Sequence, residues 1–324
     1  MPLYVERMAA ETDPRYGATP ERRSVAQHLS FGVIPLDKPC GPSSHEVSSW
    51  ARKIVGASKA GHSGTLDPQV SGVLPVALDN ATKALTFMLR SDKEYVGLMR
   101  FHKELDAGRV RKLFSEWVGR IRQKPPVRSA VRRVERERTI HRLELIELEG
   151  RDALFRVSCE AGTYVRKLCH DIGRRANVGA NMLELRRTRA AGFTEEQCCT
   201  LQGLSDAMWL WKEKGDEREI RKLVVPVERA LNFKQMVLVD GAVEAVCAGA
   251  QLALPGIARF EEGIEKGESV MLMTLKGELV AVGTALMESK EMKEQQKGFA
   301  AKTLRVVMRP GTYPRAWRKR EAPS

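Results

Sequence analysis

The densest group of residues capable of acid–base or nucleophilic chemistry lies between residues 37 and 68. It contains Asp37-Lys38-Pro39, Gly41-Pro42-Ser43-Ser44-His45 and Gly61-His62-Ser63-Gly64-Thr65-Leu66-Asp67-Pro68. Glycine permits unusual backbone angles and proline fixes φ, so a loop with both can hold a carboxylate rigidly at a cleft. Asp67 is therefore the candidate catalytic carboxylate. By pattern alone, an ordinary Asp-Pro turn explains the run at least as well.

Other motifs that carry chemistry are incomplete. The run Gly56–Gly61 has the glycine spacing of a phosphate loop, but His62 stands where the lysine is required. His102-Lys103-Glu104 matches only half of the zinc deaminase signature. The six cysteines form no C-x-x-C pair and the six histidines are scattered, so the sequence predicts no metal site.

The charge balance favours a polyanionic partner. The net charge is +13 over 324 residues, which makes nucleic acid the leading candidate and a solvated basic surface the alternative. The apolar fraction of 43% argues against global disorder, and the length suggests about two domains. No apolar run of membrane-spanning length and no signal-peptide core occur, so we expect a cytoplasmic protein with free thiols.

Two basic segments are candidates for RNA contact. In residues 120–142, Pro125-Pro126 interrupts regular structure, and we expect a mobile basic loop that contacts phosphates, with a solvated charged face as the alternative. The cations of this segment are Arg120, Arg122, Lys124, Arg128, Arg132, Arg133, Arg136, Arg138 and Arg142. The tail 312–320, which includes Arg315 and Arg318, interleaves aromatic and cationic residues. It suits stacking on bases and packing on its own domain equally well.

Hydrophobic periodicity predicts an α+β domain. Residues 43–58 have helical spacing with a capping box at Ser43 and Glu46, and residues 164–176 have a buried helical stripe. Strand patterns occur at 73–78, 95–101 and 151–160. Strands and helices mix irregularly as far as residue 230, which favours an α+β domain over a regular βαβ array.

A smaller β-rich module is predicted after residue 231. It has a helix at 241–249, strands at 269–275 and 279–286 joined by a turn at Lys276-Gly277, and a last strand at 304–308. We therefore expect an extension at 1–30 that packs on this module, a catalytic domain at 31–230, the module itself at 231–310, and a basic tail at 311–324.

Taken together, these segments resemble the TruB family of pseudouridine synthases with a C-terminal PUA RNA-binding domain. The resemblance covers roughly residues 31–317 and is closest to the archaeal and dyskerin-like branch that works with H/ACA guide RNA. The motifs that carry it are Pro35–His45, Gly61–Leu78, Pro125–Val131, Gly150–Val157, Glu160–Gly173, Leu185–Phe193, Leu254–Ile257 and Thr312–Trp317. Lys124 and the Ala190-Ala191 pair depart from the usual family residues, but neither change touches a residue assigned to chemistry.

The resemblance implies a catalytic domain with a mixed, mainly antiparallel central sheet, followed by a small β-barrel-like PUA domain. It also implies that Asp67 is the catalytic nucleophile or base and that Tyr95 stacks on the target uracil. Tyr164 and Arg166 match the Tyr-x-Arg pair, whose arginine bridges to the aspartate. Further positions implied to bind substrate are Leu185, His62, Lys38 and His45, and those implied to contact RNA are Arg128, Arg132, Arg133, Arg315 and Arg318.

The chemistry of pseudouridylation suits these residues. The N1–C1′ bond breaks, the uracil rotates, and C5 bonds to C1′. An ionised Asp67 can attack C1′ or remove the 2′ proton, and a neighbouring arginine favours and orients its charged form. Tyr95 offers a flat face to a base that has left its stack. Because the reaction is an isomerisation, no metal or redox cofactor is expected.

The resemblance implies an RNA pseudouridine synthase that acts on rRNA within an H/ACA guide-RNA particle, alone on uridine 55 of tRNA, or both. The partners it implies are guide RNA, a small zinc-ribbon protein, a small glycine/arginine-type β-barrel protein and a kink-turn-binding ribosomal-type protein. One alternative is a non-catalytic RNA-binding scaffold of a ribonucleoprotein. Another, an RNA methyltransferase, would need a glycine-rich cofactor loop that the sequence lacks.

Overall fold

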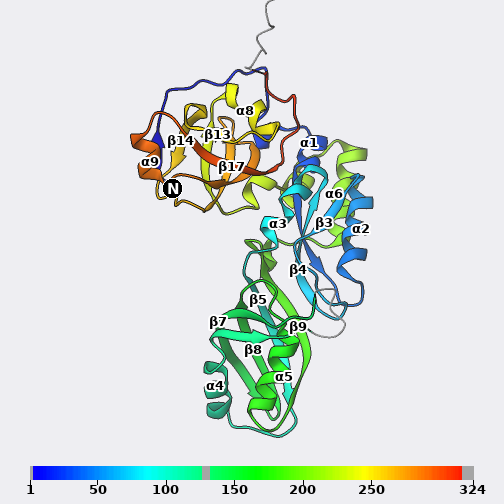
Figure 1. Ribbon diagram of the computed structural model, residues 1–324. Coiled ribbons are helices and arrows are strands. Elements are labelled where there is room, and N and C mark those ends of the chain that lie inside the picture. The colour runs from blue at the N-terminus through cyan, green and yellow to red at the C-terminus, as the bar shows by residue number, and fades with distance from the viewer. Residues whose placement is uncertain (1–2, 126–131, 316–324) are drawn as a thin grey trace, which may run out of the picture.

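The protein folds around two β-sheets in the computed structural model, which describes residues 3–125 and 132–315 (Figure 1). A ten-stranded sheet runs from the right of the view to the bottom, and a seven-stranded sheet forms the upper lobe. No described helix is long and apolar enough to cross a membrane. The expected class, an α+β catalytic domain with a small β-rich domain, is confirmed.

The larger sheet is mixed and mainly antiparallel, as expected. It contains β2 (Gly32–Lys38), β3 (Ala60–His62), β4 (Ser71–Leu78), β5 (Lys93–Phe101), β6 (Gly119–Gln123), β7 (Arg136–Glu149), β8 (Asp152–Cys159), β9 (Ala180–Ala190), β10 (Phe193–Thr194) and β11 (Val225–Pro226). The order is β11-β2-β4-β9-β5-β8-β7-β6, with β3 beside β4 and β10 beside β9. The strands predicted at 73–78, 95–101 and 151–160 correspond to β4, β5 and β8.

The two halves of this sheet meet at a short parallel contact. Ser71 and Gly72 of β4 pair with Arg186 and Arg187 of β9. Gly72 has a φ of +104°, and a Cβ there would lie 2.2 Å from the backbone oxygen of Arg187, so no side chain fits. The contact places the loop that precedes β4, which carries Asp67, against the centre of the other half of the sheet.

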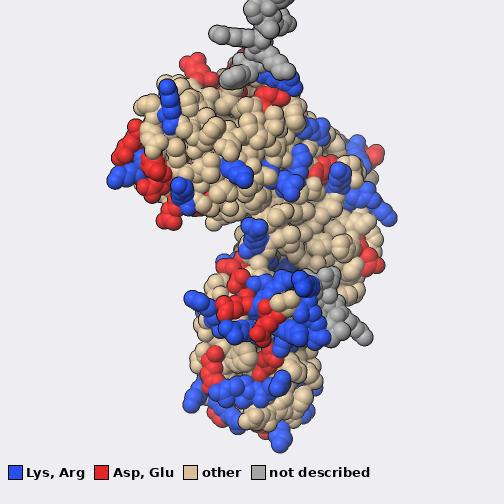
Figure 2. Space-filling model, in the orientation of Figure 1, with Lys and Arg blue, Asp and Glu red and all other residues tan. Residues whose placement is uncertain are grey.

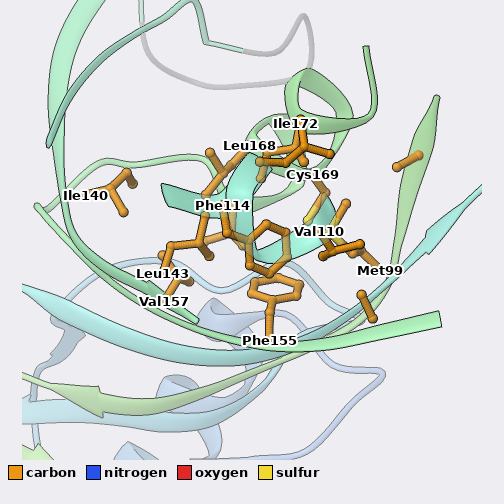
Figure 3. Close-up of a cluster of buried hydrophobic side chains, with 14 of the residues drawn as sticks. Met99, Val110, Phe114, Ile140, Leu143, Phe155, Val157, Leu168, Cys169 and Ile172 are labelled. Atoms are coloured by element: carbon orange, nitrogen blue, oxygen red, sulfur yellow. The ribbon is translucent and has the colours of Figure 1, made fainter. Parts of the chain in front are cut away.

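The half made of β5 to β9 packs one face against α4 (Ala107–Ser115) and α5 (Val165–Arg175) (Figure 3). Phe114 of α4 meets Phe155 of β8 edge to face, with ring centroids 6.2 Å apart. The helix predicted at 164–176 is confirmed. Its predicted buried stripe is also confirmed and consists of Val165, Leu168, Cys169 and Ile172.

The half made of β2 and β4 is covered by α2 (Ser44–Val55) and α6 (Leu201–Lys214). The predicted capping box is present, because Ser43 Oγ accepts from the Glu46 amide and Glu46 accepts from the Ser43 amide. Gly56, at a φ of +70°, ends α2 before the predicted residue 58. The shorter helices are α1 (Val25–Ser30), α3 (Leu85–Met88), α7 (Arg218–Leu223) and the 3-10 turns η1 (Pro20–Arg22), η2 (Asp79–Ala84), η3 (Glu195–Gln197) and η4 (Val227–Arg229).

The smaller sheet contains β1 (Tyr4–Glu6), β12 (Lys234–Leu238), β13 (Leu252–Ala253), β14 (Ile257–Glu261), β15 (Ser269–Thr274), β16 (Leu279–Ala285) and β17 (Phe299–Val306). α8 (Asp240–Cys247), α9 (Ser289–Glu294) and η5 (Leu254–Gly256) complete the domain. The predicted helix at 241–249 and the two predicted strands joined at Lys276-Gly277 are confirmed by α8, β15 and β16. The last strand begins at Phe299 rather than 304, because residues 301–303 pair with β16 and residues 299 and 301 pair with β13.

The first thirty residues contact both domains. β1 adds to the edge of the smaller sheet beside β14, and Thr12 and Asp13 bond to the Asp240 carboxylate. Further along, α1 buries Val25 and Leu29 in the core shared by α2 and β4. The segment therefore runs from the upper lobe, where it is drawn in blue, to the catalytic domain (Figure 1).

In the basic stretch 120–142, the described residues 120–123 and 136–142 form strands rather than the expected loop. Arg120 and Arg122 lie on β6, which pairs with β7 from Arg136 onward, so the loop expectation is wrong at both ends. Arg120, Arg122, Arg136 and Arg138 all take part in the β6–β7 ladder. Arg122 faces Glu137 across that ladder.

A buried ion pair joins three distant segments. The Arg23 guanidinium donates two hydrogen bonds to the Glu228 carboxylate, at 2.7 and 3.2 Å, and both side chains are about 5% exposed. Glu228 Oε1 also accepts from the backbone N–H of Leu279, at the start of β16. One carboxylate therefore fastens the N-terminal segment and the end of the catalytic domain to the smaller sheet.

We predict that Glu228→Gln lowers the free energy of unfolding by about 3–5 kcal/mol, because it leaves the Arg23 charge buried without a partner. Urea denaturation of the purified chain measures this change. Glu21→Gln is the matched control, since Glu21 bridges to Arg229 between the same two segments with both partners exposed. Its cost should be about 1 kcal/mol or less. Equal costs for the two variants would contradict the prediction.

Candidate active site

The loop that carries Asp67 is fixed by hydrogen bonds from both sides. Ser44 Oγ donates to the Leu66 carbonyl at 3.0 Å and accepts from the Leu66 amide at 2.9 Å. The Gly41 amide donates to the Pro68 carbonyl, and the Val70 amide donates to the Asp67 carbonyl. The residues on either side of Asp67 are thus held while its own side chain stays about half exposed.

Lys38 holds this loop through hydrogen bonds to its backbone carbonyls. Its side chain is fully buried, and its ammonium donates to three backbone carbonyls: Pro39 at 2.8 Å, Pro68 at 3.1 Å and Val70 at 2.8 Å. Burial lowers the pKa of Lys38. The expectation that Lys38 binds substrate is therefore corrected, because its three donors are already used and no surface of it is open to a ligand.

The N-terminus of α5 presents Arg166 to the loop. Arg166 forms an ion pair with the Asp67 carboxylate, and both side chains are more than half exposed. Tyr164 is the residue that precedes the helix, and its backbone N–H and C=O both bond to the buried Gln123 side chain of β6, at 3.0 and 3.3 Å. The structure thus brings together Asp67, Arg166 and Tyr164 from segments about 100 residues apart in sequence.

Tyr95 and Leu185 occupy the sheet beside this pair. Tyr95 lies on β5, and Leu185 lies on β9 opposite Gly97, where a Cβ would come within 2.9 Å of the leucine side chain. Gly97 therefore lets Leu185 cross the strand and pack in the core that also holds Leu66 of the loop. Tyr95 packs against the same core, so an aromatic ring and an apolar side chain lie near Leu66, the residue before Asp67. Aromatic and apolar side chains suit contact with a flat, uncharged base.

His45 and His62 form a second feature next to the loop. Their rings meet edge to face with centroids 5.0 Å apart. Burial, followed by the charges of His45 and Arg187, lowers the pKa of His62 to about 4. His62 is therefore neutral at physiological pH and offers an uncharged ring rather than a cation.

Two buried cations next to this site were not expected from the sequence. Arg187 on β9 is 1% exposed, and Lys93 at the start of β5 is 5% exposed. A period-2 pattern places Arg187 on the same buried face as Leu185, two residues earlier, and that spacing is the signal that could have identified it.

The residues expected to contact RNA are only partly described. Arg132 and Arg133 are exposed just beyond the end of the proline run, and Arg133 donates to the Pro125 carbonyl at 3.3 Å. Arg315 is exposed and lies 3.8 Å from Glu244. Arg128 and Arg318 lie outside the described residues. Tyr313 in the tail packs on its own domain, where its buried hydroxyl donates to Glu278 at 2.8 Å.

Four known domain families match consecutive parts of the chain. The DKCLD (NUC011) domain matches residues 3–48, and the TruB family pseudouridylate synthase N-terminal domain matches residues 52–165. The tRNA pseudouridylate synthase B C-terminal domain matches residues 166–232, and the PUA domain matches residues 234–307. The boundary between the second and third of these matches falls between Val165 and Arg166, at the start of α5.

Similar proteins span almost the whole chain. Probable tRNA pseudouridine synthase B of Methanosarcina barkeri is 50% identical over 320 residues, which cover 98% of this chain and 95% of that protein. The corresponding protein of Methanopyrus kandleri is also 50% identical, over 97% of this chain and 93% of that protein.

Two solved structures agree with the fold throughout. A chain in the crystal structure of a Cbf5-Nop10-Gar1 complex superimposes with a TM-score of 0.90 at 48% identity, covering 97% of each chain. A chain in an H/ACA RNP bound to a substrate RNA containing 2′-deoxyuridine superimposes with a TM-score of 0.89 at 46% identity, covering 98% of each chain. The arrangement of Asp67, Arg166 and Tyr95 thus lies in a chain that belongs to the TruB family of pseudouridylate synthases.

Proposed function

We propose that this protein converts uridine to pseudouridine in RNA with Asp67 as its catalytic carboxylate. One observation carries the proposal: Asp67 sits on a clamped loop, paired with Arg166, beside an aromatic ring on β5 and an apolar side chain on β9. Ion pairing with an arginine orients the carboxylate and favours its charged form. The site therefore combines a nucleophile or base with a surface for a flat, uncharged ring.

The isomerisation needs no co-reactant. The N1–C1′ bond breaks, and its electron pair stays on the uracil, which becomes an anion. The ring then turns, and C5 bonds to C1′ while C5 loses its proton and N1 gains one. Asp67 either bonds to C1′ or takes the 2′ proton, and in both routes it returns to its starting state when the new C–C bond has formed.

The neighbouring side chains have supporting roles. Tyr95 stacks on the uracil after it leaves the RNA helix, and Leu185 packs against the ring edge. The neutral His62 ring, held by His45, offers a further uncharged contact near the loop. The side chains proposed to touch the faces and edge of the uracil, Tyr95, Leu185 and His62, are uncharged, so the ring can turn against them without breaking an ion pair.

We further propose that the protein acts both on tRNA and on guide-directed RNA. The similar archaeal proteins are named tRNA pseudouridine synthase B, and the similar structures are a Cbf5-Nop10-Gar1 complex and an H/ACA RNP with substrate RNA. Proteins of the Nop10 and Gar1 kinds and an H/ACA guide RNA are the partners proposed, together with a kink-turn-binding protein. Mapping pseudouridine in tRNA and in rRNA, with the chain alone and with the guide components added, distinguishes the two modes.

Asp67→Asn should reduce pseudouridine formation by a factor on the order of 10⁴ or more, because the variant keeps the shape of the side chain and loses its nucleophilic charge. RNA affinity should change by no more than about twofold, since a single exposed carboxylate contributes little to phosphate binding. Single-turnover assays on a tRNA transcript and filter binding measure the two quantities.

Thr65→Ser is the control for this variant, because it changes an exposed side chain of the same loop and keeps its hydroxyl. Wild-type rates in Asp67→Asn would exclude Asp67 as the catalytic carboxylate. Absence of product from the wild-type chain, alone and with the guide components, would instead support the non-catalytic scaffold.

RNA binding should depend on the basic residues that follow the proline run. Figure 2 shows Lys and Arg side chains gathered on the lower lobe, which carries β5, β7 and β8. We predict that Arg132→Gln with Arg133→Gln reduces the slope of log affinity against log salt by about 1.4–1.8, since each phosphate contact contributes about 0.7–0.9. Affinity measured from 50 to 400 mM salt tests this.

Arg111→Gln with Lys112→Gln is the matched control for the salt dependence, because it removes two exposed charges from α4. We expect this variant to keep the slope of the wild type. Equal slopes for the Arg132 and Arg133 variant and the wild type would exclude phosphate contacts at these two positions.

A further inference from the structure

Two buried cations lie directly behind the catalytic loop. The Arg187 guanidinium donates to the Val73 carbonyl at 2.8 Å and to the Gly64 carbonyl at 3.1 Å. The Lys93 ammonium donates to the carbonyls of Leu89, at 2.7 Å, and Ser91. A Cβ on Gly64 would lie 3.6 Å from an Arg187 nitrogen and 3.9 Å from Lys93 Cε, so both side chains reach the same turn, three residues before Asp67.

Buried cations are usually paired with a carboxylate, but in the described parts of the chain these two are not. The hydrogen bonds given above all go to backbone oxygens. Burying a cation without an anionic partner is costly, and arrangements of this kind are concentrated at functional sites. Burial lowers the pKa of Lys93 to about 8, and the charge of Arg187 adds to that effect. Two cationic side chains are thus buried side by side against one turn, with backbone carbonyls as their partners.

The position of Arg187 connects it to Tyr95. The two residues are directly opposite each other in the pairing of β5 with β9, so their side chains project from the same face. Burial raises the pKa of the Tyr95 hydroxyl, and the neighbouring Arg187 charge counteracts that rise. The guanidinium therefore lies between the ring proposed to stack on uracil and the turn that leads to Asp67.

We propose that Arg187 and Lys93 are positioning residues that hold Tyr95 and the Gly64 turn and supply the positive field in which the uracil departs as an anion. The inference rests on the proposed function. When the N1–C1′ bond breaks, negative charge appears on the uracil, whereas the bound uridine is neutral. A fixed buried cation therefore stabilises the transition state more than the ground state, without reorganisation at the moment of reaction.

The charge and shape of these residues can be tested separately. Lys93→Met keeps most of the side-chain volume and removes the charge, and Arg187→Lys keeps the charge and loses the forked contacts. Lys83→Met is the matched control, because Lys83 is also partly desolvated and donates to a backbone carbonyl, that of Val307, at the junction of the two domains. Arg187→Met removes both the charge and the forked contacts. Single-turnover rates and RNA affinities are measured for all four variants on the same tRNA transcript.

We expect Lys93→Met to lower the single-turnover rate about 10- to 100-fold with RNA affinity within about twofold of the wild type, an effect of one removed charge-stabilising group. Arg187→Lys should retain more activity than Arg187→Met, and Lys83→Met should match the wild type. Rates for Lys93→Met equal to those for Lys83→Met would overturn the inference.

A second substrate separates electrostatic support from general damage. RNA with 5-fluorouridine at the target position carries a base whose anion is more stable, so its departure depends less on external positive charge. The loss caused by Lys93→Met, followed as disappearance of the N-linked base, should be at least several-fold smaller for 5-fluorouridine than for uridine. Equal losses would show that Lys93 only maintains the fold and would overturn the inference.

The proposed function is tested by different outcomes in the same series. An inactive wild-type chain would contradict the proposed function itself. A different result would contradict only the role of the buried cations. In that case the wild type is active, Asp67→Asn is inactive, and Lys93→Met is as active as the wild type.

Discussion

The active site depends on the close approach of β4 and β9 at Gly72 and Arg187. The backbone atoms there are so near that only glycine can occupy position 72. The strands on either side belong to halves of the sheet with separate helical layers and separate apolar cores. Because this contact joins them, the loop that carries Asp67 in one half faces Tyr95 and Leu185 in the other. A site built from both halves requires that join.

Backbone carbonyls serve as the partners of the cations that surround this join. Lys38 binds the carbonyls that follow Asp67, and Arg187 binds the carbonyl of Gly64 before it. A carboxylate partner would neutralise each cation, whereas a carbonyl leaves its charge in place while satisfying its donors. The loop is therefore held rigidly and remains in a positive environment, which suits a carboxylate that must stay in one orientation.

Much of the fold and part of the site could be predicted from the sequence. Periodicity located α2, α5 and β5, because each buries one face more than the other, and β4 was located as a continuous apolar run because it is buried on both faces. Asp67 and Arg166 were identified by resemblance to a family, since an Asp-Pro turn has no distinctive pattern of its own. The role of Lys38 was misjudged because a lysine beside a glycine-rich loop resembles an RNA contact, and only the three-dimensional packing shows that it is buried.

Arg187 and the paired strands around 120–142 were missed for related reasons. Arginine is rarely buried, so a charge in a basic segment is read as surface. The hydrogen bonds that bury Arg187 come from segments more than 100 residues away, which no local pattern reveals. Likewise, β6 and β7 carry many arginines that a loop would also carry. Their pairing depends on backbone bonds between residues separated by the proline run.

The place of Glu228 has a consequence for the two ends of the chain. Its carboxylate binds Arg23 near the start of the protein and the Leu279 amide in the last domain. A truncation that removes Arg23 leaves the Glu228 carboxylate, which is only 6% exposed, without its cation, although the two residues are 205 positions apart. Loss of the first residues by proteolysis therefore weakens a contact in the last domain, because the same Glu228 carboxylate binds the Leu279 amide.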